Sequence, residues 1–207
     1  MKDSSESLAG RIIYTELHPL NLLEINPEDL YKLWIYGGFP EVFLKQKKQS
    51  IVDWHASFLA TYFERDLPLL SLNLSPNLLR RTFSILAHMQ GAICNVSKLS
   101  NTLGINRRTV DRILLFFSKS YMIRKLPPFF VNVKKRLVKA PKYYIRDSGL
   151  LHHTLSITSI KALFEHPILG NSWQGCLACY EGTSRQAWVV PLFCPCLKGC
   201  FVWLGDG

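Results

Sequence analysis

Apolar residues recur at helical spacing in three short segments, 76–89, 96–103 and 107–121. Each segment places its apolar side chains three or four positions apart, which is typical of a helix that buries one face. The apolar positions are Leu79, Phe83, Leu86 and Ala87 in the first segment, Val96, Leu99 and Leu103 in the second, and Val110, Ile113, Leu114 and Phe117 in the third. The pattern therefore predicts three helices in close succession.

The break between the second and third helices has the composition of a tight turn. Gly104 follows the last apolar position of the second helix, where glycine commonly ends a helix in the left-handed conformation. Asn106 precedes the third helix and can cap it through its side-chain oxygen. A helix, a short helix, a turn with glycine and a further helix follow the order of a helix-turn-helix unit.

Extended segments and a basic connection follow the third helix. The apolar residues near Ile123 and at 129–133 precede a basic connection, and 142–146 is extended again. The basic connection consists of Lys134, Lys135 and Arg136. Two extended segments around such a connection are typical of a wing, so residues 76–146 are interpreted as a winged helix-turn-helix.

The first 75 residues indicate one strand and further helices. Residues 11–17 are rich in β-branched and aromatic residues and favour a strand. Pro27, with Asn26 as the expected N-cap, begins a helix that Gly37-Gly38-Phe39-Pro40 ends. A longer helix is expected over 50–65, and its aromatic residues are better explained as core than as a base-stacking surface. The expected fold class is therefore mainly α with small β.

The positive charge of the chain is concentrated in one stretch. The net charge is +10, and residues 98–142 hold twelve Lys and Arg against one acid, Asp111. The other residues hold thirteen basic and fourteen acidic groups. A local excess of this kind favours a polyanionic partner, and the alternative is a solvated basic face without a partner.

The predicted third helix carries the residues expected to contact duplex DNA. A recognition helix enters the major groove with its first residues nearest the bases, and arginine can bond two acceptors of guanine or a phosphate. The alternatives are that Asn106 only caps the helix, that Thr109 only supports its first turn and that the arginines are solvated. The candidate DNA-binding residues are Lys98, Asn106, Arg107, Arg108, Thr109, Arg112, Lys134, Lys135 and Arg136.

Six phrases of the sequence, taken in order, resemble the predicted prokaryotic ATPases of the AAA superfamily that carry a C-terminal domain of unknown function. The resemblance covers about residues 7–175. The phrases are Ser7-Leu-Ala-Gly-Arg11, His18-Pro-Leu-Asn-Leu-Leu-Glu24, Gly37-Gly-Phe-Pro40, Tyr62-Phe-Glu-Arg-Asp-Leu-Pro68, Lys139-Ala-Pro-Lys-Tyr-Tyr-Ile-Arg-Asp-Ser-Gly-Leu-Leu-His152 and His166-Pro-Ile-Leu-Gly-Asn-Ser-Trp173.

The resemblance implies a division of the chain into five parts. In the family, lid-like helices lie between the ATPase core and the DNA-binding unit, and a mixed α/β region follows, here truncated. The expected parts are 1–25, the remnant of the last strand of the ATPase core; 26–75, a lid-like helical region; 76–146, the winged helix-turn-helix; 147–175, the start of the C-terminal domain; and 176–207, an aberrant Cys-rich tail.

The resemblance also bears on ATP. Family members bind ATP and Mg²⁺ upstream of the first phrase, whereas this sequence has no Gly-x-x-x-x-Gly-Lys-Ser/Thr to hold phosphates. We therefore expect no ATP hydrolysis by this chain, no catalytic residue and no cofactor of its own. Arg11 is placed to reach a neighbouring subunit's nucleotide, although a simple salt bridge is the more ordinary role.

The tail after Gly175 departs from the family. The family has an acid where this chain has Gln174, and five cysteines follow: Cys176, Cys179, Cys194, Cys196 and Cys200. A zinc site is one reading, but Cys-Pro-Cys is an unusual spacing for it. A disrupted reading frame is favoured over zinc, and ordinary reduced thiols are the third alternative.

The sequence thus predicts the DNA-binding winged-helix portion of a AAA-type ATPase, as a truncated or remnant protein. The alternatives are a module that docks on a separate ATPase subunit, or associates with itself, and a nuclease-related domain. The nuclease is disfavoured because the tail offers only two carboxylates, Glu181 and Asp206. With no signal peptide and no apolar stretch of membrane-spanning length, a cytoplasmic protein without membrane contact is expected.

Overall fold

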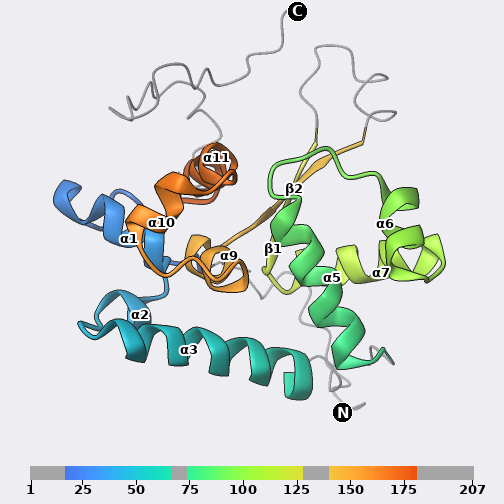
Figure 1. Cartoon of the computed structure of the whole chain (residues 1–207), viewed down its shortest axis with the longest axis horizontal. Helices are drawn as coiled ribbons and strands as arrows, with labels where there is room; N and C mark the ends of the chain where they lie inside the picture. The colour runs from blue at the N-terminus through green and yellow to red at the C-terminus, as the bar shows by residue number, and fades with distance from the viewer. Residues whose placement is uncertain (1–16, 67–73, 128–139, 181–207) are drawn as a thin grey trace, which may run out of the picture.

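The computed structural model describes residues 17–66, 74–127 and 140–180, and this part of the chain is mainly helical with one two-stranded sheet (Figure 1). The expected strand at 11–17 lies outside these residues except for Leu17. The elements are η1 Pro27–Asp29, α1 Leu30–Tyr36, α2 Pro40–Phe43, α3 Lys48–Thr61, the π-helical turn η2 Tyr62–Asp66, α5 Pro76–His88, α6 Val96–Leu103, α7 Arg107–Lys119, β1 Ile123–Leu126, β2 Lys142–Ile145, α9 Ser148–Thr154, α10 Ile160–Glu165 and α11 Leu169–Tyr180.

Helices α5, α6 and α7 begin where the sequence predicts; α6 also ends there, whereas α5 and α7 end one and two residues earlier. Asn95 and Asn106 cap α6 and α7, because their side chains accept hydrogen bonds from the backbone N–H groups of Lys98 and Thr109. Gly104 ends α6 at φ 68°, in the left-handed region where glycine has no steric penalty. The glycine at 104 and the asparagine at 106 therefore account for the short turn between α6 and α7.

Strands β1 and β2 pair in antiparallel register, with Ile123 opposite Ile145. A third segment joins them, since Ile93 forms an isolated antiparallel bridge with Lys142. The N–H of Cys94 also donates to the carbonyl of Pro141 at 3.1 Å. The segment between α5 and α6 thus lies along the outer side of β2.

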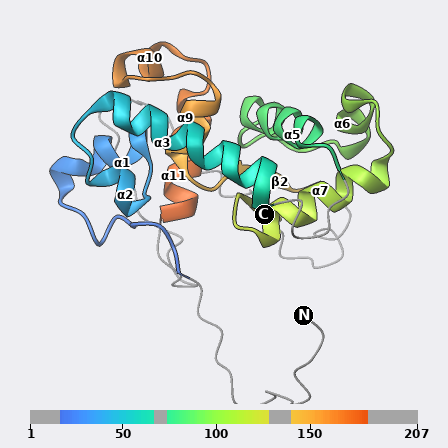
Figure 2. The ribbon, with the colours of Figure 1, turned by 90° about the horizontal axis from the view of Figure 1, so that it is seen from below.

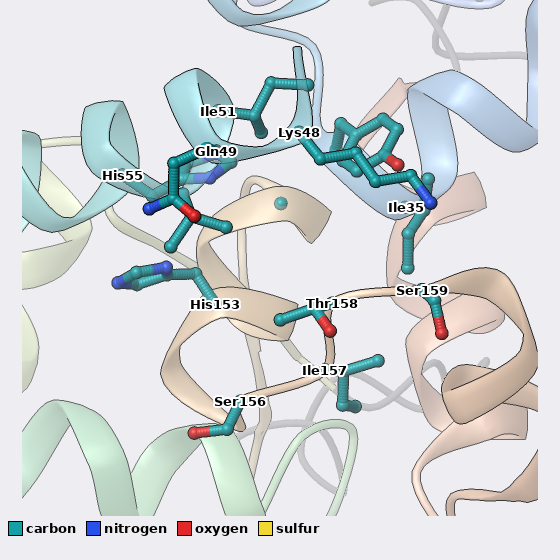
Figure 3. Close-up of a pocket in the computed structure, with 13 residues that line it drawn as sticks. Ile35, Lys48, Gln49, Ile51, His55, His153, Ser156, Ile157, Thr158 and Ser159 are labelled. Carbon is teal, nitrogen blue, oxygen red and sulfur yellow. The ribbon is translucent and has the colours of Figure 1, made fainter.

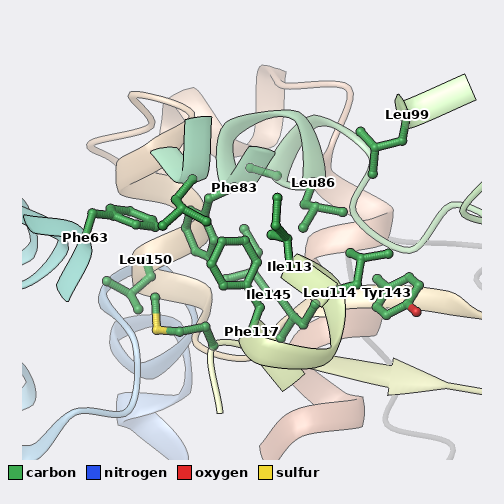
Figure 4. Packing of buried hydrophobic residues seen from close by; sticks show 14 of the residues in the cluster. Phe63, Phe83, Leu86, Leu99, Ile113, Leu114, Phe117, Tyr143, Ile145 and Leu150 are labelled. Carbon is green, nitrogen blue, oxygen red and sulfur yellow. The ribbon is translucent and has the colours of Figure 1, made fainter. Parts of the chain in front are cut away.

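A large hydrophobic cluster holds α5, α6, α7 and the sheet together (Figure 4). Phe83 of α5 and Phe117 of α7 meet edge to face, with ring centroids 5.8 Å apart. Phe63 of η2 contacts both rings, so the end of the α3–η2 segment joins the same cluster. The predicted apolar faces of the three helices are buried here, apart from Val96, which is half-buried.

A second cluster joins segments that are far apart in the sequence. Leu33, Trp34 and Ile35 of α1 pack with Leu163 of α10 and Trp173 of α11. Figures 1 and 2 show α1, α2, α10 and α11 grouped on one side of the molecule and α5, α6 and α7 on the other. The unit containing α5 to β2 is therefore inserted between two parts of one helical group.

The end of α1 and the start of α9 meet in a tight contact, called the clasp below, which is formed by Tyr36, Gly37, Gly38, Asp147 and Gly149. Asp147 is buried, and its carboxylate accepts one hydrogen bond from Gly38 N at 2.8 Å and one from Leu150 N at 2.9 Å. Gly37 adopts φ +90°, and a Cβ there would meet the Asp147 side chain at 2.3 Å. A Cβ on Gly149 would meet the carbonyl oxygen of Tyr36 at 2.0 Å. Both glycines are therefore needed for the approach of the two segments.

A buried hydrogen-bond chain connects α1, α9 and α11. Burial lowers the pKa of His152 to about 4, so its imidazole is neutral at physiological pH. His152 Nδ1 donates to the carbonyl of Ile35, and the hydroxyl of Ser172 donates to His152 Nε2 at 2.7 Å. The indole N–H of Trp34 donates to the same hydroxyl oxygen at 2.9 Å. The chain satisfies these polar groups inside an apolar cluster.

Several expectations for the first 66 residues need correction. Asn26 precedes η1, but its side chain makes no capping hydrogen bond. Of the aromatic residues expected in the core, Phe63 is buried, whereas Trp54 and Phe58 are half-buried and stack on each other with centroids 5.1 Å apart. Their spacing on one helix face is right, but α3 lies along the lower edge of the molecule in Figure 1, and its neighbours cover these two side chains only in part.

The C-terminal region also differs from expectation. Its described part, 147–180, consists of helices α9, α10 and α11 instead of a mixed α/β arrangement. Helix α11 passes through position 176 without a break, because Trp173 and Cys176, three positions apart, share the face that packs into the second cluster. Within the described residues, every helix is too short or too polar to span a bilayer.

Candidate nucleic-acid interface

The solvent-facing side of α7 carries a row of cations. Arg108, Arg112 and Lys119 are exposed, and they follow the spacing of one helix face. Leu115 lies on the same face and is 57% exposed. The opposite face is buried in the large cluster, so the helix presents this row outward from a firmly packed base.

Arg107 lies beside this row and has a weak intramolecular partner. Its Nε lies 3.9 Å from Asp111 Oδ2, and both side chains are more than half exposed. A pair of this kind contributes little to stability because water screens it. The guanidinium of Arg107 can therefore turn to an external anion at small cost.

The first turn of α7 uses its polar side chains internally. Asn106 Oδ1 accepts hydrogen bonds from Thr109 N at 2.7 Å and from Thr109 Oγ1 at 2.8 Å. The capping roles considered for Asn106 and Thr109 are therefore present in the structure. The amide group of Asn106 retains its two N–H donors, and the residue is exposed.

Lys98 is exposed on α6, the helix that precedes the turn. Arg81 of α5 bonds the carbonyl of Thr102 at 3.0 Å and so secures the C-terminal end of α6. The basic residues of α6 and α7 are thereby held on adjoining helices. Lys134, Lys135, Arg136 and Arg11 lie outside the described residues.

The sheet adds basic residues that the sequence reasoning did not single out. Arg124 and Lys125 are exposed on β1. Arg124 Nη1 donates to the carbonyl of Ala178 near the end of α11, so this side chain is engaged within the chain. Lys125 has no such partner among the described contacts. The charge count of 98–142 included both residues, but only the structure distinguishes their roles.

The groups behind the basic row are neutral. Burial, with smaller contributions from Cys94 and Asp111, raises the pKa of Tyr143 to about 12. Burial likewise raises the pKa of the Cys94 thiol, with Asp111 contributing. Neither group carries charge at neutral pH, so they do not reduce the positive potential of this surface.

The tail cysteines contribute no assembled metal site to the described residues. Cys176 is buried in the second cluster, and nothing is described for the side chains of Cys179, Cys194, Cys196 and Cys200. No group of three or more His, Cys, Asp or Glu side chains suited to a metal occurs in 17–66, 74–127 and 140–180.

Comparison with known proteins identifies the family. Residues 27–161 match the family described as "Domain of unknown function (DUF8612)". The chain belongs to this family. The matched residues include the clasp, the three helices α5 to α7 and the sheet, so the geometry described above concerns most of the family domain.

The chain is also similar to parts of longer proteins. Two mycobacterial proteins, "Uncharacterized protein Mb2031c" of Mycobacterium bovis and "Uncharacterized protein Rv2008c" of Mycobacterium tuberculosis, are 36% identical over 172 residues, covering 83% of this chain and 39% of each relative. An "Uncharacterized protein" of Haemophilus influenzae is 25% identical over 167 residues, covering 72% of this chain and 41% of the relative. No solved structure matches the chain. The chain thus spans about two fifths of the length of these relatives.

Proposed function

We propose that residues 76–146 form a winged helix-turn-helix that binds duplex DNA, with α7 in the major groove. The observation that carries the proposal is the exposed row of Arg108, Arg112 and Lys119 on the outward face of α7. Such a face, on a helix that follows a short helix and a tight turn, suits the negative charge and the width of the major groove.

The order of elements supports the winged-helix part of the proposal. A helix, a short extended segment, two helices and a β-hairpin follow one another as α5, the segment at Ile93, α6, α7 and β1–β2. In the proposed winged helix, the connection between β1 and β2 is the wing. The basic residues 134–136 of that connection are proposed as phosphate contacts.

Salt-dependent binding of the whole chain to a fluorescent duplex, measured by anisotropy, tests the proposal. We expect the logarithm of the binding constant to fall linearly with the logarithm of salt concentration. The double variant Arg108→Gln/Arg112→Gln should reduce the slope by roughly 2, since each phosphate contact contributes about 0.9. If both positions read bases instead, affinity falls while the slope changes less.

The control variant removes the same charge elsewhere. Lys47→Gln/Lys161→Gln alters two exposed lysines, one before α3 and one on α10. We expect this variant to keep the affinity of the unaltered chain. Its slope of log binding constant against log salt concentration should differ by no more than about 0.5. Equal losses in both variants, or no binding at low salt, would reject α7 as the DNA-binding element.

We further propose, on the six phrases that resemble AAA-superfamily ATPases, that this unit works beside an ATPase core in longer relatives. Leu17 and Leu23 are 95% and 90% exposed in the segment that precedes η1, which suits a covering partner there. Pull-down of an ATPase subunit after nuclease treatment tests this association. If nuclease treatment abolishes the association, DNA is the link between the two proteins and the direct contact is rejected.

A further inference from the structure

A cavity of about 490 Å³ lies between α1, α3 and α9 (Figure 3). Its walls come from α3, from the end of α1 at Ile35 and Tyr36, from α9 and from the connection 156–159. The apolar part of the wall includes Ile51 and Ile157. Figure 3 shows His55 of α3 and His153 of α9 facing this space from opposite sides.

His55 holds an unused electron pair at the cavity wall. Its side chain is 97% buried, and Nε2 has no hydrogen-bond partner. The backbone carbonyl of Tyr36 accepts a hydrogen bond from the other ring nitrogen, which fixes the proton there. Nε2 is therefore an acceptor, and a buried acceptor without a donor is destabilising. A nitrogen fixed in this way by a carbonyl is the usual arrangement of a metal-binding histidine.

The second imidazole lies at the distance that a shared metal ion requires. The ring centroids of His55 and His153 are 5.6 Å apart, and the ring planes are inclined by 38°. Two imidazoles on one zinc ion, with Zn–N distances of about 2.0–2.1 Å and a near-tetrahedral angle, have ring centres roughly 5–6 Å apart. The two helices thus already hold the rings at a suitable separation.

We propose that His55 and His153 bind a divalent transition-metal ion, with Zn²⁺ as the best fit, in an open site at the end of the cavity. The described residues gather only these two strong ligands there, so water or an external molecule completes the coordination. Hydroxyl groups of Ser156 and Thr158 line the same cavity and suit hydrogen bonds to such a ligand. Lys48 also lines the cavity, and its positive charge favours an anionic ligand. This inference is independent of the DNA proposal.

Zinc titration by calorimetry, with the full chain stripped of metal by a chelator, tests the site. The tail thiols would compete for zinc, so the measurement uses the background Cys179→Ser/Cys194→Ser/Cys196→Ser/Cys200→Ser. In this background we expect one zinc ion per chain. His153→Gln should weaken binding at least about tenfold while leaving buried His55 in place. His55→Gln should weaken it as much, and a far-UV circular dichroism spectrum checks its fold.

The matched control is His88→Gln, which alters an exposed histidine at the end of α5. This variant should retain full zinc affinity, and Co²⁺ should give the visible absorption of a nitrogen-and-oxygen site without a thiolate band. Absence of zinc binding in the background that lacks these four tail thiols overturns the proposal. Unchanged affinity in His153→Gln, or an equal loss in His88→Gln, overturns it as well.

Discussion

Adding one methyl group at Gly149 should loosen the clasp between α1 and α9. A Cβ on residue 149 would lie 2.0 Å from the oxygen and 2.4 Å from the carbon of the Tyr36 carbonyl. Both are backbone atoms that cannot move aside as a side chain would. The first residues of α9 must therefore shift by roughly 1 Å to restore an ordinary contact.

The cost follows from what that shift disturbs. Overpacking at a tight backbone contact costs about 1–3 kcal/mol. The shift also strains the hydrogen bond from Gly38 N to the Asp147 carboxylate, and a bond of this charged type contributes about 1.5–3 kcal/mol. Gly149→Ala should therefore lower the free energy of unfolding by about 3–5 kcal/mol. For a chain of this length that corresponds to a fall in Tm of roughly 10–15 °C.

The assay is thermal and urea unfolding of the purified chain, followed by circular dichroism, beside Gly170→Ala. Gly170 also lies in a helix, α11, but a Cβ there would meet no atom within 4 Å. Gly170→Ala should be neutral or stabilising by about 0.5–1 kcal/mol, because alanine favours the helix. If Gly149→Ala unfolds within about 2 °C of Gly170→Ala, the clasp is not a tight contact and the reasoning fails.

Three other changes should also be measurable in unfolding experiments. Asp147→Asn should lower the free energy of unfolding by about 2–3 kcal/mol, because an amide cannot accept from Gly38 N on one side without turning a donor toward the other; an unaltered urea midpoint would contradict this. Asn106→Ala removes the cap of α7 and should cost about 1 kcal/mol, whereas Asn106→Asp should cost little in the same urea titration. Burial raises the pKa of Tyr62 from 10.0 to about 12, so its contribution to stability is fully present below pH 10 and should fall by about 2 kcal/mol as pH rises to 12; Tyr62→Phe should lack this part of the alkaline loss, and an identical alkaline profile would argue against it.

The three-helix part could be predicted because its signals are local. Apolar residues at helical spacing fix which face of α5, α6 and α7 is buried, and Gly104 and Asn106 mark the turn within a few residues. Extended segments near Ile123 and at 142–146 were also expected, and β1 and β2 lie there. Local patterns of this kind do not depend on the rest of the chain.

The clasp and the second cluster could not be predicted in the same way. Periodicity shows that Trp34 lies on a buried face, but not that its partner is Ser172, 138 residues later. Helices α9 and α10 are short, and glycine, paired histidines and Pro167 interrupt their patterns. The two acceptors of Asp147 and the facing imidazoles of His55 and His153 depend on tertiary contacts, so the sequence contains no spacing that indicates them. For the candidate interface, the basic residues of α7 could be identified from the sequence. That Arg108, Arg112 and Lys119 share one exposed face is seen only in the structure.

The insertion of the α5–β2 unit between two parts of one helical group also constrains synthesis of the chain. The apolar face of α1 leaves the ribosome well before its partner on α11, because Trp34 and Ser172 are separated by 138 residues. At about 5–20 residues per second, that face waits roughly 7–30 s for its partner. The inserted unit, whose contacts are nearer in sequence, has time to fold first. During this interval, the nascent chain exposes a tryptophan-containing surface to which chaperones can bind.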